Sequence, residues 1–206
     1  MRLISLPILL LLLTSINAIS SRTFTPGVAE GDYFTYEMYG IYTSSIQNTT
    51  IIIPEFEKNN TDWTQIKITA VAGSTIEQTY TLYFKNDSEY QFDFETDVNP
   101  QNQEPFKISE KGVPVCAANL NPGDKIPTVK ITLKDTVNRV YFDGKRELTH
   151  ARWSQTDEQG DIYFDRETGM LVELERTHQF INPHTGNVIE KTDVIELIDT
   201  NRWQVR

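Results

Sequence analysis

Apolar and polar residues alternate along most of the chain, and this period of two is typical of half-buried β-strands. In residues 32–42, DYFTYEMYGIY, the alternation divides the side chains between two faces. One face carries Phe34, Tyr36 and Met38, and the other carries Tyr33, Thr35, Glu37 and Tyr39. Residues 64–73, TQIKITAVAG, alternate in the same way, with Ile66, Ile68 and Ala70 opposed to Lys67 and Thr69. Each segment is therefore predicted to be a strand with one face in the core.

Short turn sequences separate the later strands. Residues 79–96, TYTLYFKNDSEYQFDFET, predict a hairpin that turns at Asn86–Asp87. Its arms carry Tyr80, Leu82 and Phe84 on one side of the turn and Tyr90, Phe92 and Phe94 on the other. A strand is also predicted at residues 128–135, with Val129, Ile131 and Leu133 on one face. The dipeptide Asp143–Gly144 then predicts a hairpin turn between strands at 140–142 and 145–153, because a type I′ turn needs φ > 0 at both central residues.

One motif occurs twice near the C-terminus. Residues 168–173 read TGMLVE, and residues 185–190, seventeen positions later, read TGNVIE. In both copies the glycine falls between two predicted strands, where a hairpin loop of about three to five residues requires a left-handed residue. The interval equals one strand plus one turn. We therefore interpret the repeat as two hairpin turns, with Gly169 and Gly186 at positive φ.

The coarse fold follows from this series of strands. No segment has the period of a long amphipathic helix, and residues 51–60 and 97–106, which contain Pro and Asn, are expected to be loops. A long antiparallel meander with aromatic side chains must cover one of its faces. The predicted fold is all-β, a curved antiparallel meander sheet that forms a half-barrel or a partly open barrel.

The first eighteen residues, MRLISLPILLLLLTSINA, have the organisation of a secretory signal. Arg2 is the positive n-region, Leu3–Leu13 is the apolar h-region and Ala18 offers a cleavage site. The run is short for a membrane span, although an uncleaved anchor stays open as the alternative. We predict a signal peptide at residues 1–18 and a single exported β-rich domain at residues 19–206. Its expected location is extracellular or at the cell surface, with no transmembrane segment once the signal is removed.

The chain is acidic, with 29 Asp and Glu against 19 Lys and Arg and a formal net charge of −10. Such a surface repels nucleic-acid phosphates and anionic lipids, and no basic stripe offsets it. Nucleic acid is therefore not expected as a partner. The single cysteine, Cys116, excludes an internal disulfide, so that the stability of the domain must come from its core.

Few residues are candidates for catalysis or for metal binding. Cys116 lies in the apolar stretch GVPVCAANL, with no local cation to lower its pKa, and is expected to be a buried, inert thiol. The histidines have no metal-ligand spacing, and neither H-E-x-x-H nor G-x-S-x-G occurs. They are His150 and His178, interpreted as polar-face residues on strands, and His184, in a predicted turn. We therefore predict no catalytic residue, no metal site and no cofactor.

The remaining polar and aromatic candidates have ordinary structural interpretations. Residues 156–165, TDEQGDIYFD, are interpreted as a solvated acidic turn, with a weak calcium site as the alternative. Its carboxylates are Asp157, Glu158, Asp161 and Asp165. Three N-x-S/T sequons lie in expected loops or turns and are candidate glycosylation sites: Asn48, Asn59 and Asn86. The tryptophans are expected to fill the core, with a carbohydrate platform or a lipid cavity as the alternative: Trp63, Trp153 and Trp203.

Three segments carry a resemblance to other proteins: VAEGDYFTYEM, CAANLNPGD and YFDRETGMLVELE. They resemble uncharacterised exported archaeal β-rich proteins, and the resemblance covers most of the chain after the signal. It implies an exported β-domain and carries over no catalytic residue. More distantly, a meander with T-G-x-L hairpins is similar to the half-barrel of lipoprotein carriers of the LolA and LppX kind. The sequence departs from those carriers because no helix is expected against its concave face.

Three classes of function remain as hypotheses. The first hypothesis is a non-catalytic exported or cell-surface β-domain that binds an apolar ligand in a concave sheet. The second is an envelope structural or adhesion module whose edges and loops meet partners. The third is a hydrolase of unknown class. The expected partners are accordingly an apolar ligand or a component of the cell envelope, and the oligomeric state is left open.

Overall fold

The structure is a computed structural model that describes residues 22–44, 61–102, 113–126, 129–141, 144–181 and 186–205. Within these ranges the chain is all-β. The predicted signal peptide at residues 1–18 lies outside the described residues, as do Asn48, Asn59 and His184. Across the described ranges, no helix has the length and apolar character needed to cross a membrane.

Eleven strands are present in the described part of the chain. In order they are β1 (Tyr33–Ser44), β2 (Thr61–Ala72), β3 (Thr75–Phe84), β4 (Glu89–Asp97), β5 (Lys125–Ile126), β6 (Ile131–Thr132), β7 (Asp135–Tyr141), β8 (Gly144–Ser154), β9 (Glu158–Asp165), β10 (Leu171–Ile181) and β11 (Val188–Thr200). Nine of them form one sheet in the order β4-β3-β2-β1-β11-β10-β9-β8-β7, and β5 pairs with β6 separately. Every neighbouring pair is antiparallel.

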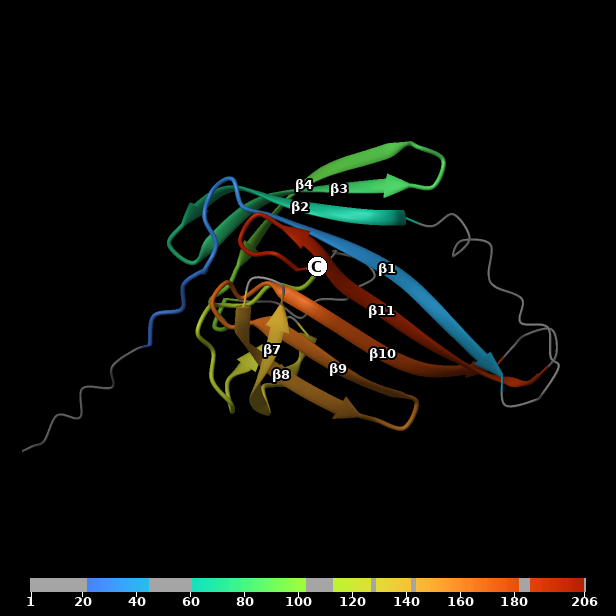
Figure 1. Cartoon of the computed structure of the whole chain (residues 1–206). Coiled ribbons are helices and arrows are strands. Elements are labelled where there is room, and N and C mark those ends of the chain that lie inside the picture. The colour runs from blue at the N-terminus through green and yellow to red at the C-terminus, as the bar shows by residue number, and fades with distance from the viewer. Residues whose placement is uncertain are drawn as a thin grey trace, which may run out of the picture.

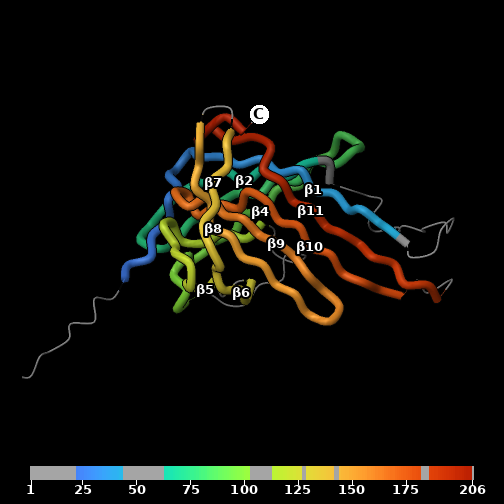
Figure 2. Tube along the Cα trace, turned by 60° about the horizontal axis from the view of Figure 1, so that its bottom comes forward, coloured from blue at the N-terminus to red at the C-terminus, as the bar shows by residue number. Residues whose placement is uncertain are grey.

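The large sheet consists of two meanders joined side by side. Strands β1 to β4 form the first and β7 to β11 form the second, and they meet where β1 pairs with β11 (Figure 1). The edges of the sheet are β4 and β7, which do not pair with each other within the described residues. The sheet is therefore curved but open (Figure 2), and the prediction of a curved antiparallel meander is confirmed.

The two faces of the sheet follow the alternation in the sequence. On β1, Phe34 and Tyr36 are fully buried, whereas Tyr39 is 44% exposed. On β2, Ile66 and Ile68 are fully buried and Lys67 between them is exposed. We call the face that carries Phe34, Tyr36 and Ile66 the inner face and the opposite one the outer face. The predicted division of side chains between faces is confirmed in these strands.

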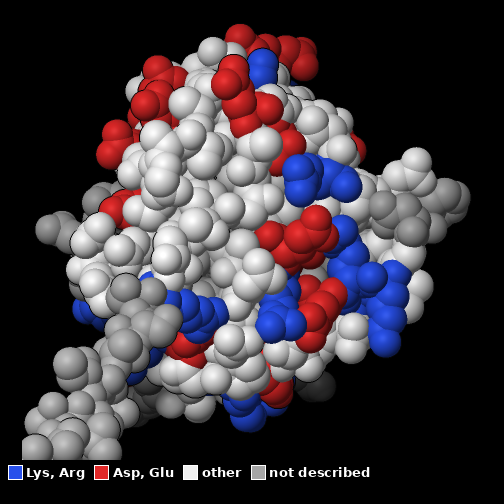
Figure 3. Space-filling view, turned by 90° about the vertical axis from the view of Figure 1, so that its left-hand side faces the viewer, with Lys and Arg blue, Asp and Glu red and all other residues white. Residues whose placement is uncertain are grey.

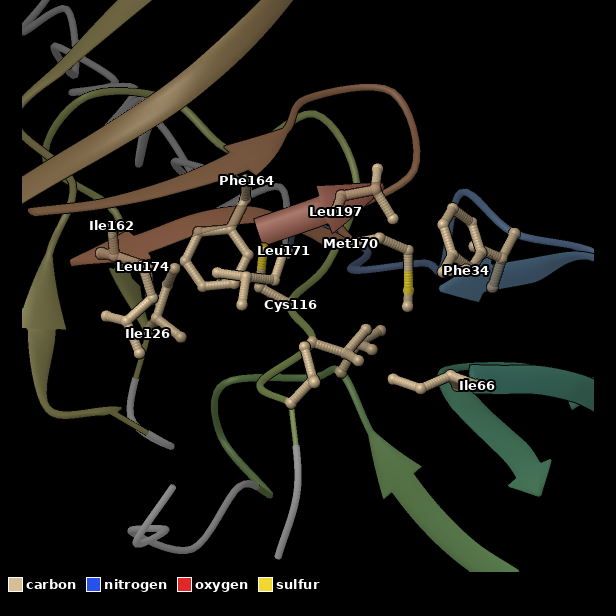
Figure 4. Packing of buried hydrophobic residues seen from close by; sticks show 14 of the residues in the cluster. Phe34, Ile66, Cys116, Ile126, Ile162, Phe164, Met170, Leu171, Leu174 and Leu197 are labelled. Carbon is tan, nitrogen blue, oxygen red and sulfur yellow. The ribbon is translucent and has the colours of Figure 1, made fainter. Parts of the chain in front are cut away.

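The inner face is covered by the connection between β4 and β7, residues 98–134, of which 98–102, 113–126 and 129–134 are described. Its buried apolar side chains are Val98, Val113, Val115, Cys116, Ala117, Leu120, Ile126 and Leu133, and all belong to the main core cluster. Figure 4 shows Cys116 and Ile126 packed among Phe164, Leu171 and Leu174 of the sheet. The Tyr80 hydroxyl ties this connection to the sheet by donating to the Val113 carbonyl at 3.0 Å, and within the sheet the Tyr36 hydroxyl donates to the Leu171 carbonyl at 3.0 Å. The described part of the connection thus fills the inner face of the sheet, and it contains no α-helix.

Two predictions about strand boundaries were wrong. The strand expected at residues 128–135 is reduced to β6, Ile131–Thr132, and β7 begins only at Asp135. Lys130 has a φ of 54°, which is incompatible with extended backbone, and it marks the bend. At the β7–β8 hairpin, Tyr141 pairs with Gly144, so that Gly144 belongs to β8 and not, as predicted, to the turn. The β3–β4 turn is confirmed, because Asp87 has a φ of 63°.

Candidate functional site

The turn between β9 and β10, which contains the first T-G copy, is organised by a buried carboxylate. Asp165 is only 1% exposed. Its Oδ1 accepts hydrogen bonds from the Thr168 amide and the Thr168 hydroxyl, both at 2.8 Å, and its carbonyl accepts one from the Gly169 amide at 2.8 Å. An aspartate that binds nearby backbone amides closes a turn in this way. The interpretation of Asp165 as part of a solvated acidic turn was therefore wrong.

A guanidinium from β8 balances the buried charge. Nε and Nη2 of Arg146 lie 2.7 and 3.0 Å from the two carboxylate oxygens of Asp165, and Nη2 also lies 2.9 Å from Glu167. The guanidinium carbon stands 4.0 Å from the centroid of the Trp203 ring. Partial burial lowers the pKa of Arg146, but its hydrogen bonds to Asp165 and Glu167 and the negative charges of both carboxylates together outweigh burial, and the net pKa is raised. The bidentate pairing of the Arg146 guanidinium with the Asp165 carboxylate fixes the turn.

The same turn is where distant parts of the chain meet. The Cys116 amide donates to the Gly169 carbonyl at 3.0 Å, and the Asn119 amide donates to the Arg166 carbonyl at 2.7 Å. The Gly27 amide donates to the Thr168 carbonyl at 3.3 Å. An N-terminal segment and the covering connection are thus both attached to this turn. The hydrogen bonds at this turn therefore hold separate segments of the fold together.

Cys116 is buried against this turn. Its side chain is 2% exposed and its thiol donates to the Gly169 carbonyl at 3.4 Å. Burial raises the pKa of the Cys116 thiol, and the nearby negative charge of Asp165 raises it further. A thiol with a raised pKa holds little thiolate and is a poor nucleophile. The predicted buried, unpaired thiol is confirmed.

A polar hollow of about 210 Å³ lies beside the turn. It is lined by Asn119, Lys145, Arg146, Glu147, Asp165, Arg166 and Glu167. Arg166 is already occupied, since its Nη1 lies 2.6 Å from Glu147 and its Nη2 lies 2.8 Å from the Asn121 side-chain oxygen. Figure 3 shows basic and acidic side chains side by side in the lower part of one face of the molecule. None of the lining residues carries a hydroxyl or a thiol.

A second hollow, of about 120 Å³, lies at the β8–β9 turn beside β10 and β11. Its lining is Gln155, Thr156, Asp157, Glu158, Gln159, Thr177, Gln179 and Glu190. The carboxylate of Glu158 accepts a hydrogen bond from the Trp153 indole at 2.9 Å. This hollow is polar as well, and neither of the two has the apolar lining expected of a lipid site.

His150 of β8 is held between two carboxylates on the outer face. Its Nδ1 lies 2.7 Å from Oδ1 of Asp135 on β7, and its Nε2 lies 2.8 Å from Oδ1 of Asp161 on β9. Both ring nitrogens donate at once only when the ring is protonated. Partial burial raises the pKa of Asp161, but hydrogen bonds from Arg152 and His150 prevail and the net pKa is lowered. The side chain predicted to lie on a polar face therefore lies on the outer face, but it is largely buried.

This network continues across the sheet. The Tyr163 ring stacks on His150 with a centroid separation of 4.5 Å and an interplanar angle of 14°. The Arg139 guanidinium stands 4.4 Å from the Tyr163 ring centroid and also bonds the Glu173 carboxylate. Charged and aromatic side chains thus link β7, β8, β9 and β10, as cross-strand pairs do when they stabilise a sheet. Sequence reasoning missed this network because its members are joined by strand register and not by spacing.

The other candidates remain apart. His178 lies 3.7 Å from Asp193, and His184 is outside the described residues. No group of three or more His, Cys, Asp or Glu side chains in the described ranges could hold a metal ion. Asn86 is exposed in the β3–β4 turn, where its side-chain oxygen accepts a bond from the Ser88 amide at 3.2 Å. Trp203 is buried in the core, Trp153 is packed against it, and Trp63 stacks on Tyr83 at 3.5 Å.

Comparison with known proteins adds no family to this description. No protein-family model matches the chain, and neither a curated protein nor a solved structure matches it.

Proposed function

We propose that the chain is a non-catalytic exported or cell-surface β-domain that works through its outer surfaces, as an envelope structural or adhesion module. The observation that carries this proposal is the occupation of the inner face by the protein's own connection. Val115, Cys116 and Leu120 are 2%, 2% and 1% exposed and pack directly on the strands. The position that an apolar ligand would take in a concave sheet is filled by these side chains.

The buried polar groups also support a non-catalytic function. The buried aspartate of the turn is neutralised by Arg146, and His150 is held by Asp135 and Asp161. Groups that are held in this way stabilise a fold, whereas a general base must be able to reach a substrate proton. Partners are therefore expected to meet edges, exposed strands and loops.

Native mass spectrometry of the protein purified from its own host tests the proposal. We expect the mass of the polypeptide, with any glycan, and no bound lipid. A lipid-carrier protein purified in parallel from the same cells shows that lipids survive the preparation. A lipid that remains bound in stoichiometric amount contradicts the proposal and favours an apolar-ligand carrier. A screen for esterase, glycosidase and peptidase activity tests the hydrolase alternative, and we expect it to be negative.

A further inference from the structure

Among the described residues, the far half of β1 has a neighbouring strand on one side only. β1 pairs with β11 from Phe34 to Ser44, but it pairs with β2 only from Tyr33 to Glu37. Figure 1 shows the reason: β2 continues beside β3 and β4, while β1 diverges from it and runs with β11 and β10. Within the described residues, Met38–Ser44 is therefore a sheet edge. Such an edge presents backbone N–H and C=O groups to which another strand can pair.

The edge lacks the features that usually protect a sheet against pairing. Soluble proteins place charged residues or proline on exposed edges. β4, an edge strand, has four carboxylates in the sequence EYQFDFETD, and the other edge strand, β7, has Asp135 and Arg139. Residues Met38–Ser44, MYGIYTS, contain no charged residue and no proline. The two outer edges of the sheet are thus protected by charge, and the far half of β1 is not.

Apolar side chains continue this edge on the outer face. Tyr39 and Ile41 are 44% and 50% exposed, and Val188 and Ile181 of the neighbouring strands are 44% and 67% exposed. Ile41 is in register with Thr192, whose hydroxyl lies 2.8 Å from the Thr177 hydroxyl on β10. The edge and the face beside it are therefore built of residues with high β-propensity and offer apolar contact area.

The charge around the edge indicates what kind of strand fits. Partial burial raises the pKa of Tyr39, and the negative charges of Glu196, Glu37, Glu173 and Glu175 raise it further. Glu173 is paired with Arg139, but the face around Tyr39 remains acidic. A second copy of this chain, whose net charge is −10, would bring the same glutamates to the same face. Charge complementarity therefore favours a basic partner.

We propose that Met38–Ser44 of β1 accepts an extended segment of another protein as an added strand, and that this segment alternates apolar with Lys or Arg residues. Backbone hydrogen bonds along the edge supply affinity. Because successive side chains of a strand point to opposite faces, the Lys or Arg residues of the segment lie on the outer face, towards Glu37 and the other glutamates around Tyr39. Its apolar residues then lie on the opposite face, beside Tyr42. The inference rests on the proposed function, because it specifies the partner of a module that acts through its surface.

The test uses the full chain and two synthetic peptides, one alternating valine with lysine and the other alternating valine with glutamate. We expect only the lysine peptide to bind and to slow amide hydrogen exchange in Met38–Ser44 by about tenfold or more. Exchange in β7, another sheet edge, is expected to be unchanged. Binding without protection of Met38–Ser44, or equal binding of both peptides, overturns the proposal.

A matched pair of variants locates the site. Ile41→Lys adds a charge to the unprotected edge and should weaken binding of the lysine peptide by at least about tenfold. Val140→Lys makes the same change on β7, at a position that is 83% exposed, and should leave binding unchanged. If Ile41→Lys does not fold, the double variant Glu37→Gln with Glu175→Gln should weaken binding and reduce its salt dependence. Equal effects of the two lysine variants contradict the assignment.

Two further outcomes are decisive. A dimer that is detected by sedimentation and lost in Ile41→Lys would make a second copy the occupant and overturn the basic partner. If the lysine peptide does not slow amide exchange in Met38–Ser44, the edge site is contradicted, but the proposal of a surface module is not affected. A bound lipid in native mass spectrometry removes the surface-module proposal, whereas peptide protection is measured independently of it.

Discussion

At the scale of single residues, the two copies of the T-G motif differ in what surrounds their glycines. Gly169 and Gly186 have φ values of 75° and 70°, so the prediction of positive φ is confirmed for both. A Cβ added at Gly169 would lie 2.1 Å from the Cys116 carbonyl oxygen, whereas a Cβ at Gly186 would meet no atom of the described residues within 4 Å. The glycine of the first copy is therefore packed closely against the covering connection, whereas no described residue crowds Gly186.

This difference gives a prediction. Gly186→Ala should cost about 1 kcal/mol of unfolding free energy, because only the left-handed backbone is strained. Gly169→Ala should cost about 2 to 4 kcal/mol, because the strain and the collision with backbone add together. Urea unfolding of both variants checks this. Equal losses would contradict the packing around Gly169.

The chemistry of Cys116 gives a second prediction. The raised pKa of the thiol and its 2% exposure should make native protein resist a thiol reagent at neutral pH, while denatured protein reacts at once. Cys116→Ala should cost about 1 kcal/mol and leave any binding activity intact. Fast labelling of the folded chain would show that the thiol is open to solvent and would return it to the list of nucleophiles.

At the scale of elements, the β9–β10 turn is held by a buried ion pair, and the loss of this pair should lower the unfolding free energy of the whole domain. Asp165→Ala removes the acceptor of two bonds from Thr168 and leaves the Arg146 guanidinium without its main partner. We expect a loss of about 3 kcal/mol in unfolding free energy. Glu167→Gln, at the more exposed end of the same cluster, is the matched control and should change stability by less than about 0.5 kcal/mol.

Urea unfolding of both variants can be monitored by tryptophan fluorescence, because Trp203 stacks on Arg146. A similar loss in both variants would mean that the exposed carboxylate, and not the buried one, holds the turn.

At the scale of the whole molecule, ion pairs across the sheet set the response to acid. Partial burial raises the pKa of Asp193, but hydrogen bonds from Lys191 and Arg176 prevail and the net pKa is lowered, as it is for Asp161. A carboxylate with a lowered pKa in the folded state stabilises the fold above its unfolded pKa of about 3.9, and this stability is lost as the pH falls through the folded pKa.

Unfolding free energy should therefore be fully present near neutral pH and decline below about pH 4. The double variant Asp161→Asn with Asp193→Asn should be less stable at neutral pH and should lose less stability on acidification. Urea unfolding at a series of pH values measures both. An acid limb of unchanged slope in the variant would place the titrating groups elsewhere.

The sequence by itself determined which side chains of a strand are buried and where several turns fall. Phe34, Tyr36, Ile66 and Ile68 are buried as the alternation predicts, because side chains on a strand point to opposite faces in turn. Gly169 and Gly186 lie in left-handed turn positions because a hairpin of that length needs them. These are consequences of geometry within a few residues, which the sequence states directly.

Only the tertiary structure decided how the strands meet and what covers them. The pairing of β1 with β11 joins the ends of the domain, and it leaves Met38–Ser44 with one neighbour in the described chain. The burial of Asp165 and the capture of His150 by Asp135 and Asp161 depend on partners that lie 11 to 19 residues away along the chain. Local alternation fixes a face for each side chain but not its partner, because the partner is set by strand order and register, which balance the packing of the whole sheet.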